Sequence, residues 1–153
     1  MKLSELIKKY GDCEVKEELV DMVVKPKGDW EPWLDENYYF ISADLQVSLA
    51  RNKGDDYAYA RIMKRNVYRT KEEAQFALGM YHFCKERSFE PDWGNRNQFK
   101  YYLYLDYNNK EANYNYTDSF NNCSPFYYPM VKATEEIINK YTFEELAKYY
   151  GRV

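Results

Sequence analysis

The sequence predicts an α+β fold in which two repeated β-β-(β)-α units form one antiparallel sheet with helices packed on one side. The first observation behind this prediction is an internal repeat. Asp29-Trp30 returns as Asp92-Trp93, and the Tyr-Tyr-Phe-Ile run at 38–41 returns as Tyr-Tyr-Leu-Tyr at 101–104, both shifted by 63 residues (92 − 29 and 101 − 38). The second observation is that a segment with helical periodicity follows the strand-like segments of each copy.

A short helical segment is expected to precede the first unit, over residues 1–28. Ser4 can cap a helix, and Gly11 suits the left-handed conformation that often follows a helix end. The apolar patch at 19–24 fits either a helix or a strand by its periodicity, and we favour a short helix that stops before Pro26.

The first unit is expected to span residues 29–90. Its first strand is the aromatic run at 38–41, because aromatic and β-branched residues suit a pleated, half-buried surface. Turn-type residues follow at 52–55, and the polar and aromatic residues at 57–63 predict the second strand. The apolar pair Val67-Tyr68 predicts a short third strand.

The helix of the first unit is expected to begin at a capping box, in which the Thr70 hydroxyl accepts from the Glu73 amide and the Glu73 carboxylate reaches back. His82, the only histidine of the chain, falls on the polar side of this helix and is expected to be solvated. The apolar residues that share the opposite stripe are Ala74, Ala77, Leu78, Tyr81 and Cys84.

The second unit, residues 91–153, is expected to repeat this order with shorter loops. Pro129 stands where the first turn of a helix tolerates proline. A further capping box, Thr142 to Glu145, predicts a terminal helix that ends before Gly151. The strands and their turn are expected at 101–104, 108–109, 113–116 and 126–127, and the helical stripe at Ala133, Ile137 and Tyr141.

One strand pair with one helix cannot bury its apolar face alone. The two units are therefore predicted to share a core, so that residues 1–153 form a single α+β domain. Two independent domains of about 60 residues each are the alternative, and they would be only marginally stable at that size.

Composition and charge narrow the classes of protein. An aromatic content of 19 % argues against disorder. The 22 Lys and Arg nearly balance the 25 Asp and Glu, so the net charge indicates no particular class of partner. No apolar run approaches the ~20 residues of a membrane helix, and the charged start shows no secretory signal. Cys13, Cys84 and Cys123 are odd in number and far apart, which fits reduced thiols. The sequence predicts a cytoplasmic protein with no membrane partner.

No catalytic or metal-binding signature is visible in the sequence. The cysteines lack the paired spacing of a zinc site, and the six glycines are isolated, so no phosphate-binding loop is present. The glutamate pairs lie in or near the first turns of predicted helices, where they complement the helix dipole. We therefore predict a protein that is not an enzyme and that uses no cofactor or metal. An enzyme with dispersed carboxylates in a concave site is the alternative.

A basic cluster occupies residues 61–71, whereas residues 12–56 hold twelve acidic and five basic residues. With tyrosines nearby, the cluster predicts a ridge that binds phosphate or an acidic partner. Pairing with the acidic segment of the same chain, or simple solvation, is the alternative. The members of the cluster are Arg61, Lys64, Arg65, Arg69 and Lys71.

The stretch 101–128 is rich in tyrosine and asparagine. Tyrosine offers a large contact area at a small entropic cost and is enriched at binding interfaces. Strand alternation places Tyr102 and Tyr104 on one sheet face, and it places Leu103 and its apolar neighbours on the other. A tyrosine-rich core is the alternative to a binding face. The predicted partner-binding residues are Tyr102, Tyr104, Tyr114 and Tyr116.

Several short motifs are shared with a known class of sequence: Lys9-Tyr10-Gly11-Asp12, Trp30-Glu31-Pro32, the Tyr-Tyr-Phe-Ile run at 38–41, Thr70-Lys71-Glu72-Glu73-Ala74 and Lys148-Tyr149. In their order the chain resembles small phage and prophage proteins of Gram-positive bacteria. Arg65-Asn66 stands where such proteins often carry Gly-Asn, which bears on the shape of that turn. The resemblance implies a phage accessory protein of the host cytoplasm. Inhibitors of host defence, including anti-CRISPR proteins, are among such proteins.

The leading hypothesis is a non-enzymatic, phage-type accessory protein that binds and inhibits a host macromolecule, either a protein or a protein–nucleic-acid complex. The alternative is a nucleic-acid or nucleotide-binding protein that uses the basic cluster at 61–71.

Overall fold

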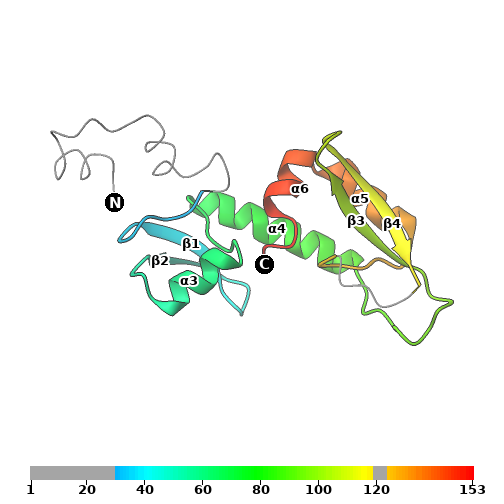
Figure 1. Ribbon diagram of the computed structural model, residues 1–153, viewed down its shortest axis with the longest axis horizontal. Coiled ribbons are helices and arrows are strands. Elements are labelled where there is room, and N and C mark those ends of the chain that lie inside the picture. Colours follow the sequence, from blue (N-terminus) through cyan, green and yellow to red (C-terminus); the bar gives the residue numbers. More distant parts are fainter. Residues whose placement is uncertain (1–29, 119–123) are drawn as a thin grey trace.

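The computed structural model describes residues 30–118 and 124–153 and shows an α+β fold, as predicted (Figure 1). The helical segment expected at 1–28 lies outside the described residues, as do Cys13 and Cys123. The elements in chain order are β1 (Asn37–Ile41), β2 (Val47–Arg51), α3 (Asp56–Met63), α4 (Lys71–Arg87), β3 (Lys100–Asp106), β4 (Glu111–Thr117), α5 (Val131–Lys140) and α6 (Phe143–Tyr149).

The first hairpin pairs β1 with β2 in antiparallel register, from Asn37 opposite Arg51 to Ile41 opposite Val47. Tyr68 extends it by an isolated bridge, because Tyr39 and Tyr68 exchange two backbone hydrogen bonds of 2.9 and 2.8 Å. The third strand expected at 67–68 is thus reduced to one bridging residue.

The second strand expected at 57–63 is wrong, because these residues form α3 and the true partner of β1 is β2. Asp55 caps α3 by accepting from the Ala58 amide at 2.8 Å, which is a local signal for a helix start. Tyr57 and Tyr59 alternate in sequence but both are exposed, so their spacing does not mark a buried sheet face.

The second hairpin pairs β3 with β4, from Lys100 opposite Thr117 to Asp106 opposite Glu111. It is extended in the same way as the first, by a bridge in which Tyr101 and Tyr128 exchange hydrogen bonds of 3.0 and 2.8 Å. The predicted sequence repeat itself stays a prediction, as do the domain boundaries.

Helix α4 lies between the two hairpins and contributes to two hydrophobic clusters (Figure 1). Ala74 and Ala77 in its first half pack with Ile41 and Tyr68. Its second half belongs to a larger cluster whose buried members are Met80, Cys84, Leu103, Phe126, Tyr128, Ala133, Ile137, Tyr141 and Leu146. Tyr149 of α6 packs against both clusters and links them.

The single antiparallel sheet expected from the sequence is wrong, because the described residues form two separate two-stranded sheets. The 17 residues of α4 make a rod of roughly 25 Å at 1.5 Å per residue. The first hairpin packs on α4, whereas the second packs on α5 and α6. The two hairpins therefore lie too far apart to join, since hydrogen-bonded strands are about 4.8 Å apart.

Two of the four helix starts in the described chain, those of α4 and α6, lie where the sequence predicts them. Thr142 and Glu145 form the full capping box at α6, with hydrogen bonds of 2.9 and 3.2 Å. At α4 only half of the box forms. The Thr70 hydroxyl accepts from the Glu73 amide, but the Glu73 carboxylate accepts from the backbone amide of Arg69 and not from that of Thr70. Pro129 precedes the first residue of α5, Val131, by two positions and so lies outside its first turn.

Candidate functional site

The four tyrosines predicted to bind a partner do not share one face of the β3–β4 hairpin. Residues that lie opposite each other in a hairpin point to the same side. Tyr102 and Tyr104 lie opposite Asn115 and Asn113, and these four residues form what we call the outer face.

The other two predicted tyrosines lie on the inner face of the hairpin. Tyr114 is opposite the buried Leu103, and Tyr116 is opposite Tyr101. Alternation predicted the sides within β3, but the side of each β4 residue depends on the register, which sequence spacing alone does not set. Tyr114 and Tyr116 are nevertheless exposed, at 40 % and 57 %.

The outer face rests on a packed aromatic floor. The Tyr102 ring makes an edge contact with Tyr127, at 6.3 Å between centroids, and Tyr127 makes another with Trp93 at 5.0 Å. Lys100 is fully buried beside them, and its Nζ donates to the Asn95 carbonyl at 2.8 Å. Tyr104, at 44 % exposure, is therefore displayed next to side chains that are held in place.

The five residues of the predicted basic ridge do not lie together either. The guanidinium of Arg61 lies 3.6 Å from the centroid of the Phe40 ring, and it donates to the Tyr38 hydroxyl at 3.0 Å. Because residues 56–63 form a helix, Arg61 is turned onto β1 and serves packing within the chain. Lys64 and Lys71 are exposed.

Arg65 and Arg69 do lie together, in a hollow of about 760 Å³ that also takes in Lys148 of α6. We call it the basic hollow. Neither spacing nor composition could have joined Lys148 to the two arginines, since more than 70 residues separate them (148 − 69 = 79). The complete lining is Trp30, Arg65, Arg69, Glu73, Tyr107, Phe143, Glu144, Ala147 and Lys148.

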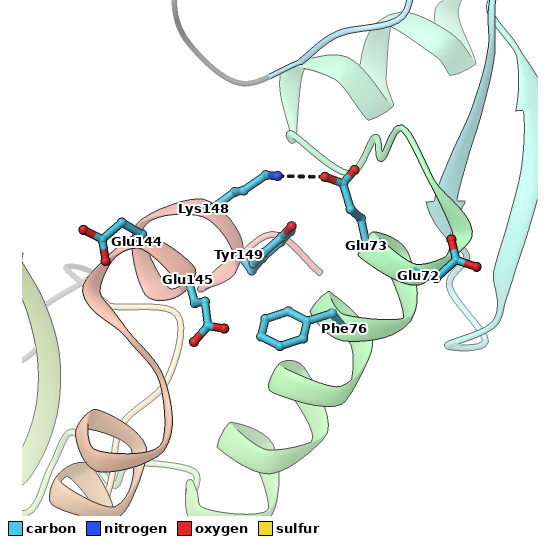
Figure 2. A pocket seen from close by; sticks show the side chains of 7 residues that line it. All are labelled: Glu72, Glu73, Phe76, Glu144, Glu145, Lys148 and Tyr149. Carbon is cyan, nitrogen blue, oxygen red and sulfur yellow. Dashed lines mark hydrogen bonds and ion pairs between the residues drawn. The ribbon is translucent and has the colours of Figure 1, made fainter.

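A second hollow, of about 420 Å³, lies beside it between α4 and α6, and we call it the acidic hollow (Figure 2). Lys148 reaches across to Glu73 at 2.8 Å, near the rings of Tyr149 and Phe76, whose centroids are 5.2 Å apart. The lining consists of Glu72, Glu73, Phe76, Glu144, Glu145, Lys148 and Tyr149.

The charged pair between the hollows is arranged to stay charged. Partial burial alone would raise the pKa of Glu73, but the hydrogen bond and charge of Lys148 and two backbone amides outweigh it and lower the pKa. Burial alone would lower the pKa of Lys148, but its bonds to Glu73 and Tyr149 raise it. A general acid at neutral pH needs a raised carboxyl pKa. The Glu73–Lys148 pair is therefore suited to holding α6 on α4 and not to proton transfer.

The remaining candidates for chemistry are dispersed. His82 is exposed on α4, and Cys84 is buried, with burial raising the pKa of its thiol to about 11. A thiol with a raised pKa is a poor nucleophile. Within 30–118 and 124–153, no three His, Cys, Asp or Glu side chains are grouped so as to hold a metal ion. The predicted lack of a metal or cofactor stays a prediction, since Cys13 and Cys123 lie outside these residues.

In the same part of the chain, every helix is too short or too polar to cross a membrane. Comparison with protein-family models, with curated proteins and with solved structures finds no match for this chain.

Proposed function

We propose that the protein is a non-enzymatic binding protein, and that it covers a surface of another protein with the outer face of the β3–β4 hairpin. The observation that carries this proposal is the exposed Tyr104 beside Tyr102, with Asn113 and Asn115 opposite them on the same face.

This combination of side chains suits protein recognition. Tyrosine presents a large, rigid surface with a hydroxyl at its end, and asparagine supplies both donors and acceptors. The aromatic floor of Tyr127 and Trp93 holds Tyr102 before any partner arrives, so less side-chain freedom is lost on binding.

The sequence resemblance to phage and prophage proteins extends the proposal to the kind of partner. In that setting the partner is a host protein or a protein–nucleic-acid complex, and a defence effector is the class that the resemblance implies. Covering a functional surface of such an effector would inhibit it without any chemical step. The charged Glu73–Lys148 pair agrees with a role that needs no proton transfer.

The test compares the two tyrosines of the outer face with two exposed tyrosines on α3. Tyr102→Ala with Tyr104→Ala is expected to reduce capture of a partner from lysate of a Gram-positive host by about tenfold or more, since interface tyrosines often act as hot spots. Tyr57→Ala with Tyr59→Ala on α3, which removes two rings of 76 % and 65 % exposure, is the control and is expected to leave capture unchanged. Quantitative mass spectrometry of the captured proteins gives the readout, and circular dichroism confirms folding.

Two results would contradict the proposal. One is equal capture by the wild-type protein and the Tyr102→Ala, Tyr104→Ala variant. The other is loss of capture only with Tyr114→Ala and Tyr116→Ala, which would place the interface on the inner face.

A further inference from the structure

We propose that the basic hollow binds a small phosphorylated ligand that carries an aromatic ring, which is the chemistry of a nucleotide. This site is separate from the outer face of β3–β4. It lies where Trp30, the turn after α3, the β3–β4 turn and α6 meet. Its volume of about 760 Å³ is in the range of small-molecule binding sites.

The cations of the hollow match a phosphate group. Arg65 and Arg69 both line it, and a guanidinium offers a planar fork of donors that fits phosphate oxygens in two places at once. Lys148 is already paired with Glu73 at 2.8 Å, so this acid is neutralised within the protein. The lining carries three basic and two acidic side chains, a net charge of +1 (3 − 2).

The position of Arg65 is set by the end of α3. Its φ is +58°, in the left-handed region that a Cβ atom disfavours and glycine adopts freely. Arg65 follows the C-cap of α3, and its amide and that of Asn66 donate to the carbonyls of Ile62 and Arg61 at 2.9 Å each, so the left-handed φ belongs to the end of the helix. This turn places the Arg65 side chain in the hollow together with Arg69.

The aromatic side chains supply a place for a ring. Tyr107 and Phe143 meet edge to face at 5.5 Å between centroids, and Trp30 lines the same hollow. Tyr107 is 66 % exposed, so much of its ring is open to a neighbour. Stacking on such side chains is the usual way in which proteins hold a nucleobase.

The neighbouring acidic hollow favours a single nucleotide over a nucleic-acid strand. It shares Glu73, Glu144 and Lys148 with the basic hollow and adds Glu72 and Glu145. A chain of phosphates that leaves the arginines in that direction would meet these carboxylates, because like charges repel. One or two phosphates at Arg65 and Arg69 avoid this repulsion.

Binding is measured by calorimetry on the full chain with nucleoside 5′-monophosphates and diphosphates, the matching nucleosides, inorganic phosphate and short single-stranded oligonucleotides. We expect at least one nucleotide to bind more tightly than its nucleoside and than phosphate. Arg65→Gly and Arg69→Ala are each expected to weaken it about tenfold, the effect of losing a charged hydrogen bond. Lys71→Ala removes an exposed charge of the same cluster from outside the hollow and is expected to change nothing.

Two measurements, one on Arg65→Gly and one on Tyr107→Leu, separate binding from folding. Arg65→Gly should not lower the melting temperature, because glycine relieves the strain at φ +58°. Tyr107→Leu should weaken binding of the nucleotide but not of phosphate.

The proposal is overturned if no nucleotide binds at millimolar concentration, if Arg65→Gly and Arg69→Ala bind as the wild type does, or if phosphate binds as well as every nucleotide. It is also overturned if oligonucleotides bind more tightly than nucleotides and Lys71→Ala weakens them, because the site would then be an extended nucleic-acid surface.

Discussion

Lys148 Nζ lies 2.8 Å from Glu73 Oε1, and this ion pair joins the last helix, α6, to the first turn of α4 across 75 residues of sequence. It stands between the basic and the acidic hollow and contributes to both linings. The Phe76–Tyr149 contact lies beside it and adds an apolar contact between the same two helices. The position of α6, and with it the shape of both hollows, therefore depends in part on this pair.

The pair should make stability depend on pH in a defined window. The folded-state pKa of Glu73 is below its usual 4.5, so its contribution is present above pH 4.5 and is lost as the pH falls through the lowered pKa. The pKa of Lys148 is above 10.5, so its contribution is present below that pH and is lost as the pH rises through the raised pKa. Glu73→Gln is expected to lower the free energy of unfolding by about 0.5–1 kcal/mol at pH 7, the size of a half-exposed pair.

Urea unfolding at several pH values checks this prediction, with Lys148→Met and the double variant completing a mutant cycle. The coupling energy should be largest between pH 5 and pH 10 and should shrink at pH 3. A coupling energy that is the same at pH 3 and pH 7 would show that the two charges do not interact as described.

The two bridging tyrosines, Tyr68 and Tyr128, should respond in opposite ways to the loss of their hydroxyl groups. The Tyr68 hydroxyl is buried and has no hydrogen-bond partner in the described chain, and burial raises its pKa to about 12. Tyr68→Phe keeps the ring and removes an unsatisfied polar group, so stability should stay the same or rise by about 1 kcal/mol. The Tyr128 hydroxyl bonds to that of Tyr150 at 3.2 Å, so Tyr128→Phe should cost about 1 kcal/mol.

Chemical denaturation of the two variants, followed by circular dichroism, gives the comparison. A clear loss of stability in Tyr68→Phe would contradict a buried hydroxyl without a hydrogen-bond partner among the described residues.

The parts of the fold that could be predicted from the sequence are those with local causes. The helix starts at Thr70 and Thr142 are set by side chains three residues apart, and the β1 and β3 segments by aromatic runs. Strand β2 was missed because the turn before it carries Leu45 at φ +58°, where a turn signal would be glycine or asparagine. The separation of the two sheets follows from the different helices on which the hairpins pack, α4 for β1–β2 and α5 with α6 for β3–β4, and no single segment encodes this.

For the candidate sites too, the features that could be predicted are those with local causes. Tyr102 and Tyr104 share a face because alternation along one strand is a local rule. The placement of Tyr114 and Tyr116 on the other side depends on the four-residue turn between Asp106 and Glu111, which sets the register. Arg65, Arg69 and Lys148 line the same hollow only because the chain folds α6 next to the turn after α3. A run of basic residues in the sequence does not show which of its members will line such a hollow.

Gly151, which follows α6, should not tolerate a side chain. Its φ is +78°, and an added Cβ would lie 2.9 Å from Cγ of Pro125. Gly151→Ala is therefore expected to destabilise the protein by about 1–2 kcal/mol through backbone strain and crowding. Gly79→Ala is the matched control, because nothing lies within 4 Å of its added Cβ. In a helix interior this change should stabilise by about 0.5–1 kcal/mol. Thermal unfolding of both variants measures the difference, and equal effects would contradict the geometry described.

Cys84 should resist thiol reagents in the folded protein. It is fully buried on α4, and burial raises the pKa of its thiol to about 11, against smaller lowering effects of Tyr128 and Arg87. Both access and the thiolate fraction are therefore low at pH 8. Labelling with iodoacetamide, followed by mass spectrometry of the Cys84 peptide, is expected to be slow in buffer and at least tenfold faster in urea, where the chain is unfolded and the pKa returns toward 8.5. Equally fast labelling in both conditions would show that the second half of α4 opens readily, and would contradict its place in the larger hydrophobic cluster.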